Sequence, residues 1–368
     1  MLEIPAFFIG LYILLIIWVI FEMTKIKTEN FDKIPPAKKF SILIPFRNEE
    51  KNLKKLVDSL NHLNYPSSLF EVIFINDRST DQGEKIIHQN IHVPYQLISI
   101  RKKNTSPKKE ALEKGINLAK FPYIITTDAD CILPENWLME YNGKWREKNT
   151  KMILGPVKYS DKPSFINQFQ ILEFLSLQAF TMAGVACGNP FLSNGANLSF
   201  LKKAFQQVDG YTGNKHIVSG DDVFLTEKFR KNFPGEIKFL KSPGAIVNTH
   251  AQPDRKNLFQ QKIRWASKSS KIKNPMNQLM GFVILTGNFS LLYLFFLLPF
   301  SPLSVFILFF LKILFDWLLV SKTNNFYQNH LKTKYFLLTE LTYPFYLLWI
   351  VWGMKKKNYT WKGNKYNT

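Results

Sequence analysis

Four long apolar runs near the two ends of the chain limit the folds that are open to it. The runs cover residues 4–21, 279–300, 303–320 and 335–354. A run of about 18 to 20 apolar residues is long enough to cross the hydrocarbon core of a bilayer as a helix. We therefore expect an N-terminal transmembrane anchor at residues 1–24 and a C-terminal membrane region at residues 276–354.

The first run has the features of an uncleaved anchor. The acidic residue Glu3 lies near the start of the run, and residues 18–21 read Trp-Val-Ile-Phe. A secretory signal peptide has a basic start and a small-residue cleavage site. Lys25 and Lys27 follow directly, so the positive-inside rule places the next domain in the cytoplasm. Residues 25–39, which include two adjacent prolines, are expected to form a linker.

The C-terminal region leaves its topology open. Little more than Ser301 and Pro302 separates the second and third runs, which predicts a tight helical hairpin. Three full spans after a cytoplasmic domain would place the basic tail, residues 355–368, outside, against the positive-inside rule. Because Glu340 and Pro344 lie inside the last run, it is the candidate for a re-entrant or interfacial segment. The region therefore has two or three spanning helices.

The chain is strongly basic, with a formal net charge of +20 and a pI of about 9.7. This balance indicates an anionic partner, either nucleic acid or a membrane surface. Aromatic residues make up 15% of the chain, and many of its 33 phenylalanines lie in the apolar runs. This distribution favours a membrane as the anionic partner, and we expect no nucleic acid partner. Five basic residues just before the second run are expected to face the anionic cytoplasmic leaflet: Lys262, Arg264, Lys268, Lys271 and Lys273.

Between the anchor and the C-terminal runs, short β-rich stretches alternate with helical patterns. The β-rich stretches cover residues 40–45, 70–75, 95–100 and 123–127. Helical patterns begin near residues 47 and 82, and a third covers residues 111–119. Such alternation predicts an α/β fold with a doubly wound, parallel sheet that is covered on both faces. We assign this domain to residues 40–275.

Two aspartates stand at the end of the last of these strands. Asp128 and Asp130 flank the small Ala129, so the alternation of a strand puts both carboxylates on the same side. Open α/β sheets bind their ligands at strand ends, and carboxylate oxygens suit Mg²⁺ or Mn²⁺. The pair therefore predicts a divalent metal site, and the simpler alternative is a polar turn after a buried strand.

Two further patterns carry candidate chemistry. Asp221 and Asp222 are adjacent carboxylates, and their repulsion favours a raised pKa on one of them, as a general base requires. Acidic residues also stabilise the N-terminus of a helix. The pair can serve as a general base and as a helix start at the same time. Gln261, Arg264 and Trp265 are spaced to share one face of a helix. A guanidinium can bind diphosphate oxygens and an indole can border a sugar ring, whereas membrane-surface packing is the alternative.

The segments at residues 41–50, 75–81 and 128–130 resemble the family 2 glycosyltransferases, which have the GT-A fold, a doubly wound mixed sheet, here flanked by transmembrane helices. The resemblance implies that Asp77 contacts the base or ribose of a nucleotide sugar and that Lys108 contacts the nucleotide. It implies that Asp128 and Asp130 hold the metal on the diphosphate. Residues 193–200 resemble the acceptor side of the family.

The resemblance also assigns the acid pair and the motif near residue 261. It makes Asp222 the catalytic base and Asp221 a substrate-binding residue, at a position where the family usually has Glu. Gln261, Arg264 and Trp265 match the Gln-x-x-Arg-Trp motif of membrane-bound synthases, with Arg264 assisting catalysis at the diphosphate and the other two binding substrate.

These features together imply an inverting glycosyltransferase in a bacterial inner membrane, with its catalytic domain in the cytoplasm. The expected donor is a nucleotide sugar, in the first place a UDP-sugar, and the acceptor is a lipid, a lipid-linked sugar or a glycan. A processive polysaccharide synthase with partner subunits is one alternative, and a catalytically inactive membrane scaffold is another. Too few spans are expected for a polymer channel, which favours transfer of a single sugar.

Overall fold

The computed structural model describes residues 2–31, 33–100, 106–269, 271, 274–355, 358–361 and 364–367. Lys273 of the basic cluster and Lys356 and Lys357 of the basic tail lie outside the described residues. The chain forms two compact units. One unit comprises residues 26–160 and 184–250, and the other comprises residues 1–25, 161–183 and 251–368. Residues 161–183 and 251–275, which the sequence-based division places in the 40–275 domain, therefore belong to the second of these units.

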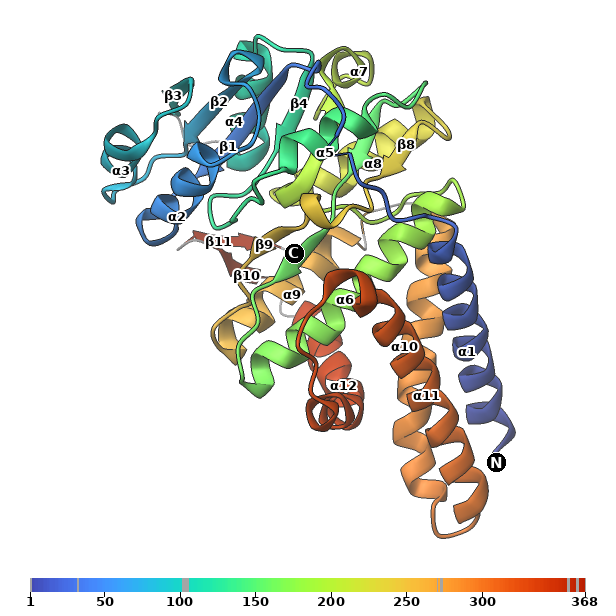
Figure 1. Cartoon of the computed structure of the whole chain (residues 1–368). Helices are drawn as coiled ribbons and strands as arrows, with labels where there is room; N and C mark the ends of the chain where they lie inside the picture. The colour runs from blue at the N-terminus through green and yellow to red at the C-terminus, as the bar shows by residue number, and fades with distance from the viewer. Residues whose placement is uncertain are drawn as a thin grey trace. The chain divides into compact units, whose positions relative to one another are not determined.

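The unit of residues 26–160 and 184–250 is built on a seven-stranded sheet in the order β3-β2-β1-β4-β7-β5-β8 (Figure 1). Four parallel strands occupy one side of the sheet: β1 (Phe40–Phe46), β2 (Phe70–Asn76), β3 (Tyr95–Ser99) and β4 (Tyr123–Thr126). The other side contains β5 (Met152–Leu154), β7 (Leu198–Leu201) and β8 (Ile237–Phe239). Since β7 runs antiparallel to both β4 and β5, the sheet is mixed. The parallel sheet expected from the alternation alone is thus correct for the first four strands only.

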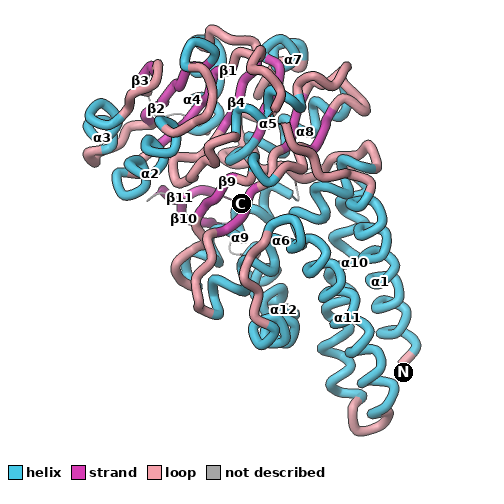
Figure 2. Tube along the Cα trace, in the orientation of Figure 1, coloured by secondary structure: helices cyan, strands magenta, loops and turns pink. Residues whose placement is uncertain are grey.

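Helices cover this sheet as the sequence pattern predicts (Figure 2). They are α2 (Glu50–Asn61), α3 (Gly83–Asn90), α4 (Pro107–Leu118), α5 (Trp137–Lys144), α7 (Lys202–Gln207) and α8 (Asp221–Asn232). In α2, Leu53, Leu56, Val57 and Leu60 recur at helical spacing and are all fully buried. Helix α4 comes close to the sheet at Gly115, where a Cβ atom would lie 3.0 Å from a methyl carbon of Ile75. A small parallel pair, β6 (Val157–Tyr159) and β9 (Val247–Thr249), completes the unit.

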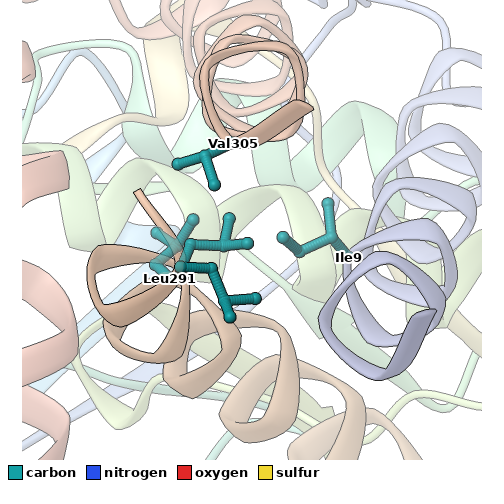
Figure 3. Packing of buried hydrophobic residues seen from close by; sticks show 5 residues of the cluster. Ile9, Leu291 and Val305 are labelled. Carbon is teal, nitrogen blue, oxygen red and sulfur yellow. The ribbon is translucent and has the colours of Figure 1, made fainter. Parts of the chain in front are cut away.

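The other unit is mainly helical. It contains α1 (Glu3–Thr24), α9 (Arg255–Ser269), α10 (Pro275–Leu297), α11 (Pro302–Tyr327), α12 (Thr333–Met354), most of α6 (Phe165–Ala186) and the hairpin of β10 (Asn358–Trp361) and β11 (Asn364–Asn367). Helices α1, α10 and α11 pack side by side (Figure 1). Their shared core is an apolar cluster of Ile9, Leu291, Leu294, Leu297 and Val305 (Figure 3).

Five helices of the described residues are long and apolar enough to cross a membrane: α1, α6, α10, α11 and α12. Four of them correspond to the four apolar runs, and α12 is a continuous helix although Pro344 lies inside it. Helix α6 is an additional candidate that the apolar runs do not reveal, and most of its apolar part is buried. These helices make the chain a membrane-associated protein.

Three of these helices share a buried charged cluster. Lys312 of α11 forms ion pairs with Asp316 one turn later, at 2.6 Å, and with Glu340 of α12, at 2.5 Å. The hydroxyl of Tyr12 on α1 donates to Asp316 at 2.6 Å. A charge inside a membrane is costly unless it is paired, so the cluster both satisfies these groups and ties the first helix of the chain to two of the last.

Candidate functional site

The loop after β2 places the first predicted residue, Asp77. The side chain of Asp77 is 12% exposed and its Oδ1 accepts from Arg78 Nε at 2.9 Å, while Arg47 Nη1 lies 3.7 Å from Oδ2. Arg78 and Asn48 adopt left-handed backbone conformations, with φ of 55° and 52°. The side chain of Asn48 accepts from the backbone N–H of Thr80 at 2.8 Å, so the loops after β1 and β2 hold each other in place.

Lys108 brings together acids from distant parts of the sequence. Its Nζ lies 2.8 Å from Asp128 Oδ1, which follows β4, and 3.2 Å from Asp221 Oδ2 at the start of α8. Burial opposes the charge on Lys108, but the carboxylates of Asp128, Asp221 and Asp222 outweigh it and raise the pKa of the Lys108 ammonium well above its usual value. Three residues that the sequence assigns to separate roles therefore share one charged cluster.

Asp222 lies beside this cluster and is oriented by backbone groups. Its Oδ2 accepts from the N–H of Gly195 at 3.3 Å, and its Oδ1 accepts from the N–H of Val223 at 2.8 Å. The carbonyl of Gly195 in turn accepts from Thr126 Oγ1 at 2.8 Å, at the end of β4. A Cβ atom on Gly195 would lie 3.1 Å from Asp221 Oδ2 and 3.4 Å from Lys108 Nζ, so only glycine fits without displacing these groups. The turn before β7 thus forms one wall of the site.

A second lysine, Lys109, fixes the loop that leads into the acid pair. Lys109 is buried, and its Nζ donates to the carbonyls of Asn214 and Ile217, each at 2.8 Å. Four residues further along α4, Glu113 pairs with Lys215 at 2.7 Å. Sequence reasoning missed this anchoring role, although the adjacent lysines at the start of a helix were a visible signal.

Asn197 is another residue whose role the sequence did not reveal. It belongs to the 193–200 segment assigned to the acceptor side, yet it is fully buried. Its Oδ1 accepts from Trp137 Nε1 at 2.9 Å and from Tyr141 OH at 2.8 Å, and its Nδ2 donates to the carbonyls of Pro156 and Ala245. Asn197 therefore joins the turn before β7 to three other segments: α5 and the segments at Pro156 and Ala245.

Asp128 and Asp130 are the residues that could hold a divalent ion. Within the described part of the chain, no group of three or more His, Cys, Asp or Glu side chains is arranged to bind a metal. Two carboxylates suit an ion that takes its remaining ligands from water and substrate phosphates. The side chain of Asp128 is 35% exposed and already has an ammonium group beside it, so the position accommodates positive charge. The donor set therefore fits Mg²⁺ or Mn²⁺.

The remaining predicted residues, Gln261, Arg264 and Trp265, lie on α9 in the other unit. The Oε1 atom of Gln261 is buried and has no hydrogen-bond partner among the described residues. Lys262, which the sequence places in the leaflet-facing cluster, is buried and pairs with Glu173 of α6 at 2.5 Å, so that prediction was wrong for this residue. The placement of this motif against the carboxylates stays a prediction.

One solved structure resembles the chain over nearly its whole length. A solved mannosyltransferase from Pyrobaculum calidifontis, PcManGT in complex with GDP-Man and Mn²⁺, matches the chain with a TM-score of 0.60 and 14% identity, over 96% of this chain and 97% of that one. At that identity the likeness shows the fold alone. The chain has the GT-A fold, as the sequence resemblance implied, and contains helices that are long and apolar enough to cross a membrane.

The sequence comparisons connect one part of the chain with a known family. Residues 41–209 match the model of Glycosyl transferase family 2. The chain is 24% identical over 229 residues to a poly-beta-1,6-N-acetyl-D-glucosamine synthase of Staphylococcus epidermidis, covering 61% of this chain and 53% of that protein. It is 28% identical over 121 residues to the poly(ribitol-phosphate) beta-N-acetylglucosaminyltransferase TarP of Staphylococcus aureus, covering 32% and 36%. The matches thus span about half or less of these relatives.

Proposed function

We propose that the chain is an inverting, membrane-bound glycosyltransferase that moves a sugar from a nucleoside-diphosphate sugar to a hydroxyl of a glycan or lipid-linked acceptor. The observation that carries the proposal is the convergence at Lys108, where Asp128 and Asp221 pair with one ammonium group and Asp222 lies next to them. Acids from the end of β4 and the start of α8 thereby meet at the strand ends where open α/β sheets bind ligands.

In the proposed reaction, each residue of the site has one task. Asp77 and Lys108 bind the nucleotide portion of the donor. A divalent ion held by Asp128 and Asp130 would offset the negative charge that develops on the departing diphosphate. Asp222 removes the proton of the acceptor hydroxyl, whose oxygen attacks C1 of the sugar from the face opposite the diphosphate.

The C1–O bond to the diphosphate breaks in this step and its electron pair leaves with the nucleoside diphosphate, so the configuration at C1 inverts. Gln261, Arg264 and Trp265 contact the substrates from α9, with Arg264 near the diphosphate and Trp265 beside the acceptor. A guanidinium offers paired N–H donors to phosphate oxygens, and an indole face packs against a sugar ring.

The relatives suggest the substrates. Both curated relatives described above are named for N-acetylglucosamine, so we propose UDP-N-acetylglucosamine as the donor and a glycan as the acceptor. We also propose that the catalytic domain faces the cytoplasm at a bacterial inner membrane. Polymerisation, with partner subunits, is a second candidate because one relative is a poly-N-acetylglucosamine synthase. Counting the sugars added to each acceptor molecule separates single transfer from polymerisation.

Nucleotide release from detergent-purified protein tests this proposal. The protein is incubated with Mn²⁺ and a donor panel of UDP-N-acetylglucosamine, other UDP-sugars and GDP-mannose, in the presence of short β-1,6-linked N-acetylglucosamine oligosaccharides. We expect release with one donor that is lost on chelation and in Asp222→Asn. Asp58→Asn, an exposed position on α2, is the matched control and should keep full activity. Equal release by Asp222→Asn and wild type would contradict the proposal and favour a scaffold role.

A further inference from the structure

Lys262, in the middle of the Gln261–Trp265 segment, is a buried cation held between a carboxylate and an indole. Its Nζ lies 2.5 Å from Glu173 Oε2 of α6 and 4.2 Å from the centre of the Trp265 ring, one turn later on α9. The side chains of Lys262 and Glu173 are only 6% and 10% exposed. Burial of a lysine is unfavourable unless its charge is satisfied, so this arrangement requires both neighbours.

A second set of contacts holds α9 independently of this pair. Phe259 stacks on Trp349 of α12, with ring centres 4.0 Å apart and an angle of 14° between the planes. A Cβ atom on Gly353 of α12 would lie 2.4 Å from Phe259, so the two helices meet at a point where only glycine fits. This apolar packing fixes the helix axis but makes no demand on the orientation of Trp265.

The contact between Lys262 and Trp265 does make such a demand. An ammonium group is attracted to the negatively polarised face of an indole and not to its edge, so it selects one orientation of the ring. Glu173 keeps the ammonium in place by pairing with it from α6. A chain of two contacts that begins at Glu173 therefore helps to orient the Trp265 indole.

We propose that Lys262 is a positioning residue: paired with Glu173, it holds the Trp265 indole in the orientation that receives the acceptor glycan. The inference rests on the proposed function, in which Trp265 borders the acceptor. Neither Lys262 nor Glu173 is one of the three residues that define the motif, and Lys262 acts through Trp265 without contacting substrate.

The test compares three variants: Lys262→Arg, Lys262→Met and the reversed pair Lys262→Glu with Glu173→Lys. The acceptor KM, measured with β-1,6-linked N-acetylglucosamine oligosaccharides, should rise about tenfold in Lys262→Met while the donor KM stays unchanged. Lys262→Arg keeps a cation over the ring and should restore the wild-type value. The reversed pair should recover the wild-type Tm but keep the raised acceptor KM, because a carboxylate cannot hold the indole face.

Trp265 fluorescence gives a readout that needs no substrate. The emission of Trp265 is obtained as the difference between each protein and the same protein with Trp265→Phe. We expect this emission to shift in Lys262→Met and in the reversed pair and to stay unchanged in Lys262→Arg. Lys256→Met removes a charge from an exposed position of the same helix and should change neither KM nor emission.

Two results would overturn the inference. A lowered Tm with unchanged acceptor KM and unchanged Trp265 emission in Lys262→Met would mean that the pair only tethers α9 to α6. Recovery of both the Tm and the acceptor KM by the reversed pair would also mean that the pair only tethers α9 to α6. If Lys262→Met does not fold, the reversed pair alone decides between the two roles. If the wild-type protein transfers no sugar, the proposed function fails, and the emission comparison still decides the role of Lys262.

Discussion

Replacing Lys108 by methionine should destabilise the catalytic unit in a way that Mn²⁺ repairs. The substitution keeps the length of the side chain but removes the ammonium group that lies 2.8 Å from Asp128 and 3.2 Å from Asp221. These carboxylates, with Asp222 beside them, would then repel one another. Breaking a fully buried ion pair costs about 3–5 kcal/mol, whereas an exposed pair contributes about 0–1 kcal/mol.

The exposure of the three side chains places this case between those limits. Lys108 is 21% exposed, Asp128 35% and Asp221 12%, so we expect a loss of about 2 kcal/mol. For a unit of roughly 200 residues this corresponds to a fall in Tm of about 4–8 °C. A divalent ion held by Asp128 and Asp130 would offset the charge of the freed Asp128 carboxylate, so Mn²⁺ should raise the Tm of the variant more than that of wild type.

Thermal unfolding in detergent, followed by tryptophan fluorescence with and without Mn²⁺, measures both effects. Lys114→Met, at an exposed position of the same helix, is the matched control and should leave the Tm unchanged. A Lys108→Met variant as stable as wild type would refute the role of this lysine as the link between the acids. A variant that is destabilised but insensitive to Mn²⁺ would refute the metal site at Asp128 instead.

Three further predictions follow from other parts of the chain. Asn197→Ala removes four buried hydrogen bonds and should lower the free energy of unfolding by about 3–5 kcal/mol, measured by denaturant titration. Lys312→Met leaves Asp316 and Glu340 as buried acids without their cation. The fraction of the protein that detergent extracts as a monodisperse species should therefore fall sharply. A yield equal to that of wild type would contradict this role of Lys312. Hydrogen bonds from Asn76 and Ser99 lower the pKa of Glu84 in the folded protein. The contribution of Glu84 to the free energy of unfolding is therefore complete above its unfolded-state pKa and is lost as the pH falls through the lower folded-state pKa. In Glu84→Gln, the pH dependence of the free energy of unfolding should lack this acid-dependent component.

The first half of the sheet could be predicted from sequence because each strand is a continuous apolar run. Residues 40–46 and 70–76 are buried along nearly their whole length, as strands covered on both faces must be. The antiparallel insertion of β7 could not be predicted, since Leu198–Leu201 is too short to show a period and follows a turn-like segment. Helix α6 escaped detection because four amide side chains interrupt its apolar pattern and make it less apolar than α1. These are Asn167, Gln168, Gln170 and Gln178.

Predicting the site was possible where residue type and strand position agree. Asp77 directly follows β2, and Asp128 lies two residues after the end of β4. Parallel strands bring such ends to the same edge of a sheet. The link that Lys108 makes to Asp221 joins residues more than one hundred positions apart, so no local pattern reveals it. For Lys262 the local pattern was misleading. Its basic neighbours predict an exposed position, but Lys262 is buried because it pairs with Glu173, a partner that is distant in the sequence.

Elongation of an oligosaccharide acceptor tests the central claim most directly. Wild-type protein and Asp222→Asn are each incubated with UDP-N-acetylglucosamine, Mn²⁺ and a β-1,6-linked N-acetylglucosamine oligosaccharide, and the products are resolved by mass spectrometry. We predict that wild type adds one or more sugars and that Asp222→Asn binds the donor with unchanged affinity but adds none. Elongation by Asp222→Asn at the wild-type rate would contradict the assignment of the catalytic base and, with it, the proposed mechanism.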